Sequence, residues 1–245
     1  MKAVILIIIL IFAGQILGSL IGVIFKPSRK ILHSSLAFAA SIMISISLFQ
    51  LIPQSHELIS AIPLLLFFFI GFIFIFFIDK LIPHINPELS KKEKPSVKKS
   101  IFMLVIGMAI HNIPEGLAEG SGLALSSTFG IGIALALAIH DIPENIATII
   151  PLYNLNKSRI KSFLITTVTI LFELFGFLVA YYLLEVSHKF IGIFLAFAAG
   201  VMIYISSEEL LPNSNFKRYF KADITALILG FLIFILIVIS TMLFF

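Results

Sequence analysis

Long apolar stretches separated by short polar ones dominate the pattern along this chain. Eight stretches are long enough to cross a membrane as helices, because about 20 residues at about 1.5 Å each span the hydrocarbon core. They cover residues 3–25, 33–53, 62–83, 101–124, 128–151, 160–184, 190–212 and 222–244. The first is too long for the apolar part of a signal peptide, and no small-residue cleavage site follows it, so we count it as a span. The pattern predicts an all-α integral membrane protein with eight transmembrane helices in a single domain, 1–245.

Lys and Arg residues gather in alternate connections between these stretches. All 17 of them except Lys2 and Lys189 lie within 26–30, 80–99, 157–161 and 217–221. Because cytoplasmic loops are enriched in Lys and Arg, these connections are expected in the cytoplasm. The loop 84–99 is then cytoplasmic and both termini are extracytoplasmic, in a multi-pass protein of the cell membrane. The basic residues thus determine topology, and the net charge of +4 needs no nucleic-acid partner.

The composition supports this class and limits the chemistry. Hydrophobic residues make up 60% of the chain, charged residues 12%, and the mean hydropathy is +1.13, which excludes an ordinary soluble domain. The chain contains no cysteine. Disulfides, thiolate metal sites and cysteine nucleophiles are therefore excluded, and any metal must be held by nitrogen, oxygen or methionine sulfur.

Two near-identical polar motifs interrupt the fourth and fifth apolar stretches. They are His111-Asn112-Ile113-Pro114-Glu115 and His140-Asp141-Ile142-Pro143-Glu144. In a helix the His and Glu of each motif stand one above the other, four residues apart, while Asn112 and Asp141 lie about 100° around the helix. An imidazole and a carboxylate at this spacing form a chelating pair for a divalent cation. Placing such groups in hydrocarbon costs at least about 2.5–3.5 kcal/mol each, so a doubled motif predicts a functional site.

Carboxylates without basic partners accompany these motifs. Residues 101–156 contain no Lys or Arg, so the acids cannot form ordinary salt bridges and must protonate or bind cations. Glu119 continues the His111/Glu115 face by one more turn. Glu173, the one acid in the middle of the sixth stretch, can alternatively be read as a protonated, hydrogen-bonded structural acid. Spans four to six contain five acids, namely Glu115, Glu119, Asp141, Glu144 and Glu173.

An internal repeat relates the second and seventh stretches. Leu36–Ser55 aligns without gaps on Leu195–Ser214, and twelve of the 20 aligned residues are identical, including one proline and one methionine. The two stretches cross the membrane in opposite directions, so the repeat is inverted, a plan that recurs in secondary transporters. Spans one to three and six to eight are then related halves, with spans four and five between them.

At these motifs the sequence resembles the ZIP family of divalent metal transporters. The resemblance rests on His111 to Gly116, on the related fifth-span motif, and on the seventh span through Ala198 to Met202 and Glu208 to Pro212. It covers nearly the whole chain. It implies eight spans in a three-plus-two-plus-three arrangement, with Zn²⁺, Fe²⁺ or Mn²⁺ moving towards the cytoplasm through a two-metal centre between spans four, five and six. Co²⁺ and Cd²⁺ are further candidate substrates.

The resemblance also implies ligands, position by position. One ion would use His111, Glu115, His140 and Glu144, with Met43 as an accessory. The second would use Asn112, Glu115, Asp141, Glu144 and Glu173, with the two shared glutamates bridging. Further accessory candidates are Glu119, Glu208 and Glu209. The expected partners are the lipid bilayer and the transported ions, with a homodimer left open.

Two other functions remain as alternatives. An intramembrane metal-dependent hydrolase would want the order His-Glu-x-x-His, with the glutamate as base, whereas the order here is His-x-x-x-Glu. A proton-coupled transporter of a small organic solute also uses membrane acids and histidines, but it does not require doubled chelating pairs. Metal accumulation, peptide cleavage and organic solute uptake are the readouts that separate the three.

Overall fold

The computed structural model describes residues 2–25, 27–81, 97–183, 187–214 and 216–244, and within these ranges its regular elements are all helical. Eight helices of the described part are long and apolar enough to cross a membrane, which confirms the predicted fold class. The elements are α1 (Lys2–Ile24), α2 (Arg29–Ile46), η1 (Ser47–Leu51), α3 (Ile52–Leu58), α4 (Ala61–Leu81), α5 (Val97–Leu125), α6 (Ser127–Asn156), α7 (Arg159–Leu183), α8 (His188–Tyr204), η4 (Ile205–Leu210), α9 (Leu211–Asn213) and α10 (Phe216–Phe244).

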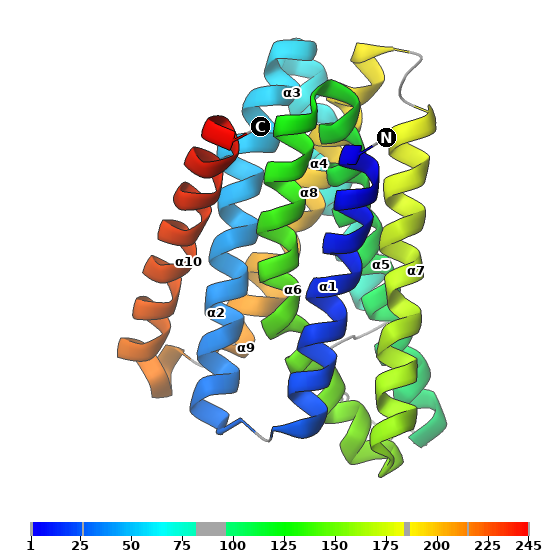
Figure 1. Ribbon diagram of the computed structural model, residues 1–245, viewed down its shortest axis with the longest axis vertical. Coiled ribbons are helices and arrows are strands. Elements are labelled where there is room, and N and C mark those ends of the chain that lie inside the picture. Colours follow the sequence, from blue (N-terminus) through cyan, green and yellow to red (C-terminus); the bar gives the residue numbers. More distant parts are fainter. Residues whose placement is uncertain (1, 26, 82–96, 184–186, 215, 245) are drawn as a thin grey trace.

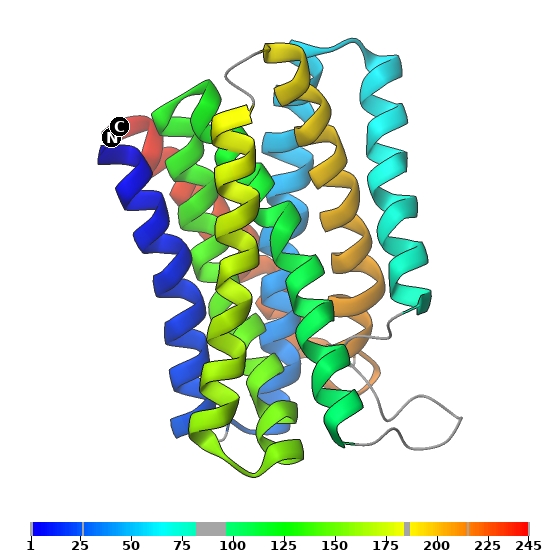
Figure 2. The same cartoon turned by 90° about the vertical axis from the view of Figure 1, so that its right-hand side faces the viewer.

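The spanning helices run alternately up and down in one bundle, and both termini lie at the same end (Figures 1 and 2). We call this the terminal end; it also holds the junction between α5 and α6. The opposite end, where α1 leads into α2 and α6 into α7, we call the basic end. The described Lys and Arg residues lie at the basic end, apart from Lys2 and Lys189. The predicted alternation between Lys- and Arg-rich connections and connections poor in these residues is therefore present in the fold.

Helix bounds differ from the apolar stretches mainly where basic residues extend a helix beyond the hydrocarbon. α5 begins at Val97, four residues before the apolar stretch, because Lys98 and Lys99 are good helix formers that need no burial. The loop predicted at 84–99 lies outside the described residues up to residue 96, and His84 is among those not described.

Both copies of the predicted repeat contain one π-helical turn, η1 and η4, at the equivalent place. The N–H of Ile52 donates to the carbonyl of Ser47, and the N–H of Leu211 donates to the carbonyl of Ser206. These two residue pairs correspond in the gap-free alignment of the repeat. The proline that follows each turn has no N–H, and the widened turn accommodates the missing hydrogen bond.

The helix contacts obey the same symmetry. α5 packs on α7 and α1 on α6, while α4 packs on α8 and α10 on α2. Exchanging spans one to three with six to eight, and span four with span five, converts each pair into its counterpart. Glycine permits the closest of these approaches: a Cβ on Gly116 would overlap the carbonyl of Glu173, and one on Gly14 would overlap that of Ala138. The inverted repeat is thus visible in both local backbone and packing.

Burial divides the helices into an inner and an outer set. In the most apolar window of α5 and α6, 61% and 67% of residues are buried, against 17% in α4 and 22% in α10. The exposed residues of α4 and α10 are mostly large and apolar, as a lipid-facing surface requires. The two helices that carry the polar motifs are therefore central and shielded from lipid.

Candidate metal centre

The two polar motifs face each other in the middle of α5 and α6. Both helices run continuously through their motif prolines, Pro114 and Pro143. All six polar residues of the two motifs are buried, none more than 4% exposed: His111, Asn112, Glu115, His140, Asp141 and Glu144. Residues 101–156 contain no Lys or Arg, so within this stretch only imidazoles can balance these acids with positive charge.

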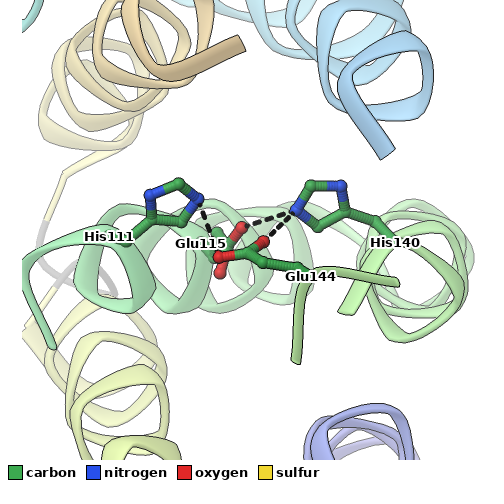
Figure 3. A group of neighbouring side chains, drawn as sticks. All are labelled: His111, Glu115, His140 and Glu144. Carbon is green, nitrogen blue, oxygen red and sulfur yellow. Dashed lines mark ion pairs between the residues drawn. The ribbon is translucent and has the colours of Figure 1, made fainter. Parts of the chain in front are cut away.

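Four side chains converge in what we call the imidazole group: His111, Glu115, His140 and Glu144. Each offers one ligand atom, and these atoms lie within 4.8 Å of one another. Nε2 of His140 lies 2.6 Å from Oε2 of Glu144 and 3.3 Å from Oε1 of Glu115, and Nε2 of His111 lies 3.0 Å from Oε1 of Glu144. Figure 3 shows both carboxylates between the two imidazole rings. The i,i+4 pairs predicted from the sequence meet across the two helices.

A backbone contact from α2 fixes the orientation of one imidazole. Nδ1–H of His140 donates to the carbonyl of Ala39 at 2.9 Å. This bond places the proton on Nδ1 and leaves Nε2 directed at the two glutamates, as expected for a histidine that presents one nitrogen to a cation. The second span thus takes part in the site through its main chain.

A second cluster, which we call the oxygen group, consists of Glu115, Asp141 and Glu173. One carboxylate oxygen from each lies within 4.8 Å of the others, and all three side chains are buried. Glu115 belongs to both groups, whereas Glu144 belongs to the imidazole group alone. The resemblance implies that both glutamates bridge the two ions; of the two, Glu115 is the one with an oxygen in each group.

The remaining expected ligands lie close by but make other contacts. Nδ2 of Asn112 donates to the carbonyl of Thr169 at 3.2 Å, which ties α5 to α7. Met43 is fully buried on α2, one turn from Ala39 and therefore near the carbonyl that orients His140.

The three accessory acids differ in environment. Glu119 is fully buried beside the oxygen group, within electrostatic range of Asp141 and Glu115. Glu209, on η4, is also buried and interacts electrostatically with His111. Glu208 is exposed on the same π-helical turn, away from the buried groups.

The sequence analysis missed Gln15 on α1. Its Nε2 donates to Oε2 of Glu173, so a first-span amide reaches the oxygen group. The signal available was weak: a single amide within a long apolar span, flanked by Gly14 and Gly18, which let α1 approach α6. No motif marks it, and its partner is 158 residues away along the chain.

The two groups offer different donor sets at the same depth. Two imidazole nitrogens with carboxylate oxygens suit Zn²⁺, Fe²⁺ or Co²⁺, whereas a set of oxygens alone suits Mn²⁺ and other harder ions. Without a cation, several like charges would stand within about 4–5 Å, where each pair costs roughly 4 kcal/mol at an effective dielectric constant of about 20. The arrangement favours binding of divalent cations.

Comparison with known proteins supports the same conclusion. Residues 90–238 match the family model described as ZIP zinc transporter. Proteins named zinc transporter ZupT from Salmonella arizonae and from Salmonella heidelberg are each 33% identical over 210 residues, covering 82% of this chain and 82% of the relative. The match to the family model includes both polar motifs, Glu173 and the second copy of the repeat. The chain belongs to the ZIP family of zinc transporters.

Proposed function

We propose that this protein carries divalent transition-metal ions, Zn²⁺ first among them, towards the cytoplasm through a two-ion centre between α5, α6 and α7. The observation that carries the proposal is the imidazole group, whose four buried ligand atoms lie within 4.8 Å of one another. Fe²⁺, Mn²⁺, Co²⁺ and Cd²⁺ are further substrates that such donors accept. The first ion uses His111, Glu115, His140 and Glu144.

The second ion uses the oxygen group together with Asn112, and Glu115 and Glu144 bridge the two ions. Charge supports two ions. The five buried acids of the centre carry −5 when ionised, one divalent ion leaves −3, and two leave −1. Two ions therefore compensate the centre far better than one, and a group of acids left without cations must retain protons.

A small cavity supports release at the basic end. It has a volume of about 20 Å³ and extends from Glu144 past Met108 and Thr148 to Pro151, which lies nearer the basic end on α6. In the other direction an apolar cluster that includes Ile11, Leu123 and Phe177 packs between the centre and the terminal end. The cavity beside Glu144 thus lies on the side of the basic end.

The basic end is the cytoplasmic one in this proposal, and the membrane is the cell membrane. The enrichment of Lys and Arg supports the assignment. Because the chain has no cysteine, single-cysteine labelling tests it without background. Ser60→Cys and Ser28→Cys place exposed thiols at the terminal and basic ends. An impermeant thiol reagent added to intact cells is expected to label the first and not the second; the reverse pattern contradicts the orientation.

Membership of a transporter family decides against the hydrolase alternative. The organic solute alternative has no observation in its favour, because the doubled His/Glu chelate has no use in it. Metal transport is the candidate function that uses both the imidazole group and the oxygen group.

The test is metal flux in proteoliposomes that contain the purified protein. Zn²⁺ placed outside vesicles loaded with a zinc-sensitive dye is expected to enter faster than in protein-free vesicles, and Glu144→Ala, at equal protein content, is expected to abolish most of the difference. Vesicles in which Zn²⁺, Fe²⁺, Mn²⁺, Co²⁺ and Cd²⁺ all fail to enter would refute the proposal.

A further inference from the structure

Gln15 brings a fourth helix to the oxygen group. The side chain is 1% exposed, in the middle of α1. Its amide nitrogen donates to Glu173, so the amide lies against the oxygen group, yet its Oε1 has no hydrogen-bond partner among the described residues. A buried amide oxygen without a partner costs about 1–3 kcal/mol. A cation held by the neighbouring carboxylates would remove that cost.

Glu119 presents a second unsatisfied group near the oxygen group. It is fully buried, and both of its carboxylate oxygens lack hydrogen-bond partners within the described part of the chain. It stands one turn beyond Glu115 on α5, towards the terminal end, and interacts electrostatically with Asp141 and Glu173. Among the residues that the structure describes, the charged groups that interact with it are acids, and none of these compensates its charge.

We propose that Gln15 and Glu119 belong to the second ion position, Gln15 as a ligand through Oε1 and Glu119 as an additional carboxylate on the terminal side. This inference rests on the proposed two-ion centre and extends it to α1. It turns the second position into a set of carboxylate and amide oxygens from α1, α5, α6 and α7, with no imidazole.

That donor set defines a class of ion. Carboxylate and carbonyl oxygens suit Mn²⁺ and Mg²⁺, whereas imidazole suits Zn²⁺. The second position should therefore favour Mn²⁺ relative to Zn²⁺ more strongly than the imidazole group does. Each added oxygen donor strengthens this difference, since the harder ion accepts more oxygen ligands.

The test is equilibrium binding of Mn²⁺ and of Zn²⁺ to the purified protein in detergent, with bound metal counted after dialysis. Gln15→Leu removes the amide at similar volume, and Glu119→Gln removes the charge at similar shape. Gln50→Leu is the matched control: it is another span amide with a buried, unpartnered Oε1, but it lines a cavity at the terminal end beside Phe231 and Phe234.

Both variants are expected to weaken Mn²⁺ binding about 10- to 100-fold, while the Zn²⁺ affinity of the imidazole group changes less than about threefold and Gln50→Leu binds as the unmodified protein does. Gln15→Glu keeps an oxygen donor and loses the amide hydrogen bond, so it separates ligation from support of Glu173. It is expected to bind Mn²⁺ at least as tightly as the unmodified protein.

Four outcomes overturn the inference. The first is Mn²⁺ affinity unchanged in Gln15→Leu and Glu119→Gln, and the second is a loss of Zn²⁺ affinity equal to the loss for Mn²⁺. The third is Gln15→Glu binding as weakly as Gln15→Leu, which would make Gln15 a support for Glu173 only. The fourth is an unmodified protein that binds a single ion; this one also overturns the two-ion centre, whereas the first three leave that centre intact.

Discussion

The imidazole group and the oxygen group share Glu115 and the same depth, yet they balance charge in opposite ways. In the imidazole group every acid faces an imidazole, at 2.6 to 3.3 Å. In the oxygen group three carboxylates face one another, and the hydrogen bond that Glu173 accepts within the described part of the chain comes from the neutral amide of Gln15. One group can compensate itself through protonated histidines; the other depends on protons or cations from outside. We expect them to respond differently to the same kind of change.

The largest effect is expected from breaking the imidazole group at His140. This side chain contacts both glutamates and is itself held by Ala39, so His140→Ala removes a ligand and the best-oriented member of the group. A four-ligand zinc site is worth about 10–16 kcal/mol in total, so one lost ligand costs several kcal/mol, or about 100-fold or more in Zn²⁺ affinity.

The measurement is Zn²⁺ binding and proteoliposome uptake at equal protein content. His56→Ala is the control, because His56 is an exposed histidine on α3. Uptake by His140→Ala at half the normal rate or more would show that the imidazole group is not the main ion position.

A smaller effect is expected from the oxygen group, where Asp141→Asn with Glu173→Gln removes two charges at nearly constant volume. The double variant should bind one ion per chain in place of two and retain part of the Zn²⁺ transport, because the imidazole group keeps all its ligands. Metal counting by mass spectrometry decides it. Two ions still bound, or none, would mean that the groups are not separate positions.

Proton release sharpens the same comparison. Metal displaces protons from its ligands, and the oxygen group, with like charges only, must hold protons when it is empty. Addition of Zn²⁺ to the unmodified protein in weak buffer is therefore expected to release more protons per chain than addition to the double variant. A pH-indicator dye measures the difference; equal release by the two proteins contradicts the charge argument.

Several of these features follow from the sequence because they depend on local pattern. The repeat predicted from Leu36–Ser55 and Leu195–Ser214 has the same π-helical turn in both copies, since Ser47 and Ser206 both accept the shifted hydrogen bond. The His and Glu of each motif share one face of their helix, as the helical spacing predicts. In each case, residues a few positions apart determine the geometry.

Other features depend on contacts between distant segments, and sequence patterns do not reveal these. Gln15 reaches Glu173 only because glycines let α1 lie close against α6. Equivalent positions of the repeat also differ in environment. Gln50 and Glu209 align, but Gln50 lines a cavity at the terminal end and Glu209 is buried near His111. Glu208 and Glu209 are adjacent acids, and the π-helical turn exposes one and buries the other.

The smallest effect is expected at Asn112, a proposed ligand that also joins α5 to α7. Its Nδ2 is already used in the bond to the Thr169 carbonyl, and a neutral amide oxygen is a weaker ligand than a carboxylate. Asn112→Ala should therefore lower the affinity for the second ion by about two- to tenfold. This range corresponds to the net contribution of one hydrogen bond, about 0.5–1.5 kcal/mol. Asn145→Ala is the matched control, since Asn145 is a buried amide that donates to a backbone carbonyl within its own helix. Titration of Mn²⁺ into both variants gives the comparison. If Asn112→Ala loses as much as the Asp141/Glu173 double variant, Asn112 is a full ligand of the oxygen group; if it matches Asn145→Ala, its role is confined to holding α5 against α7.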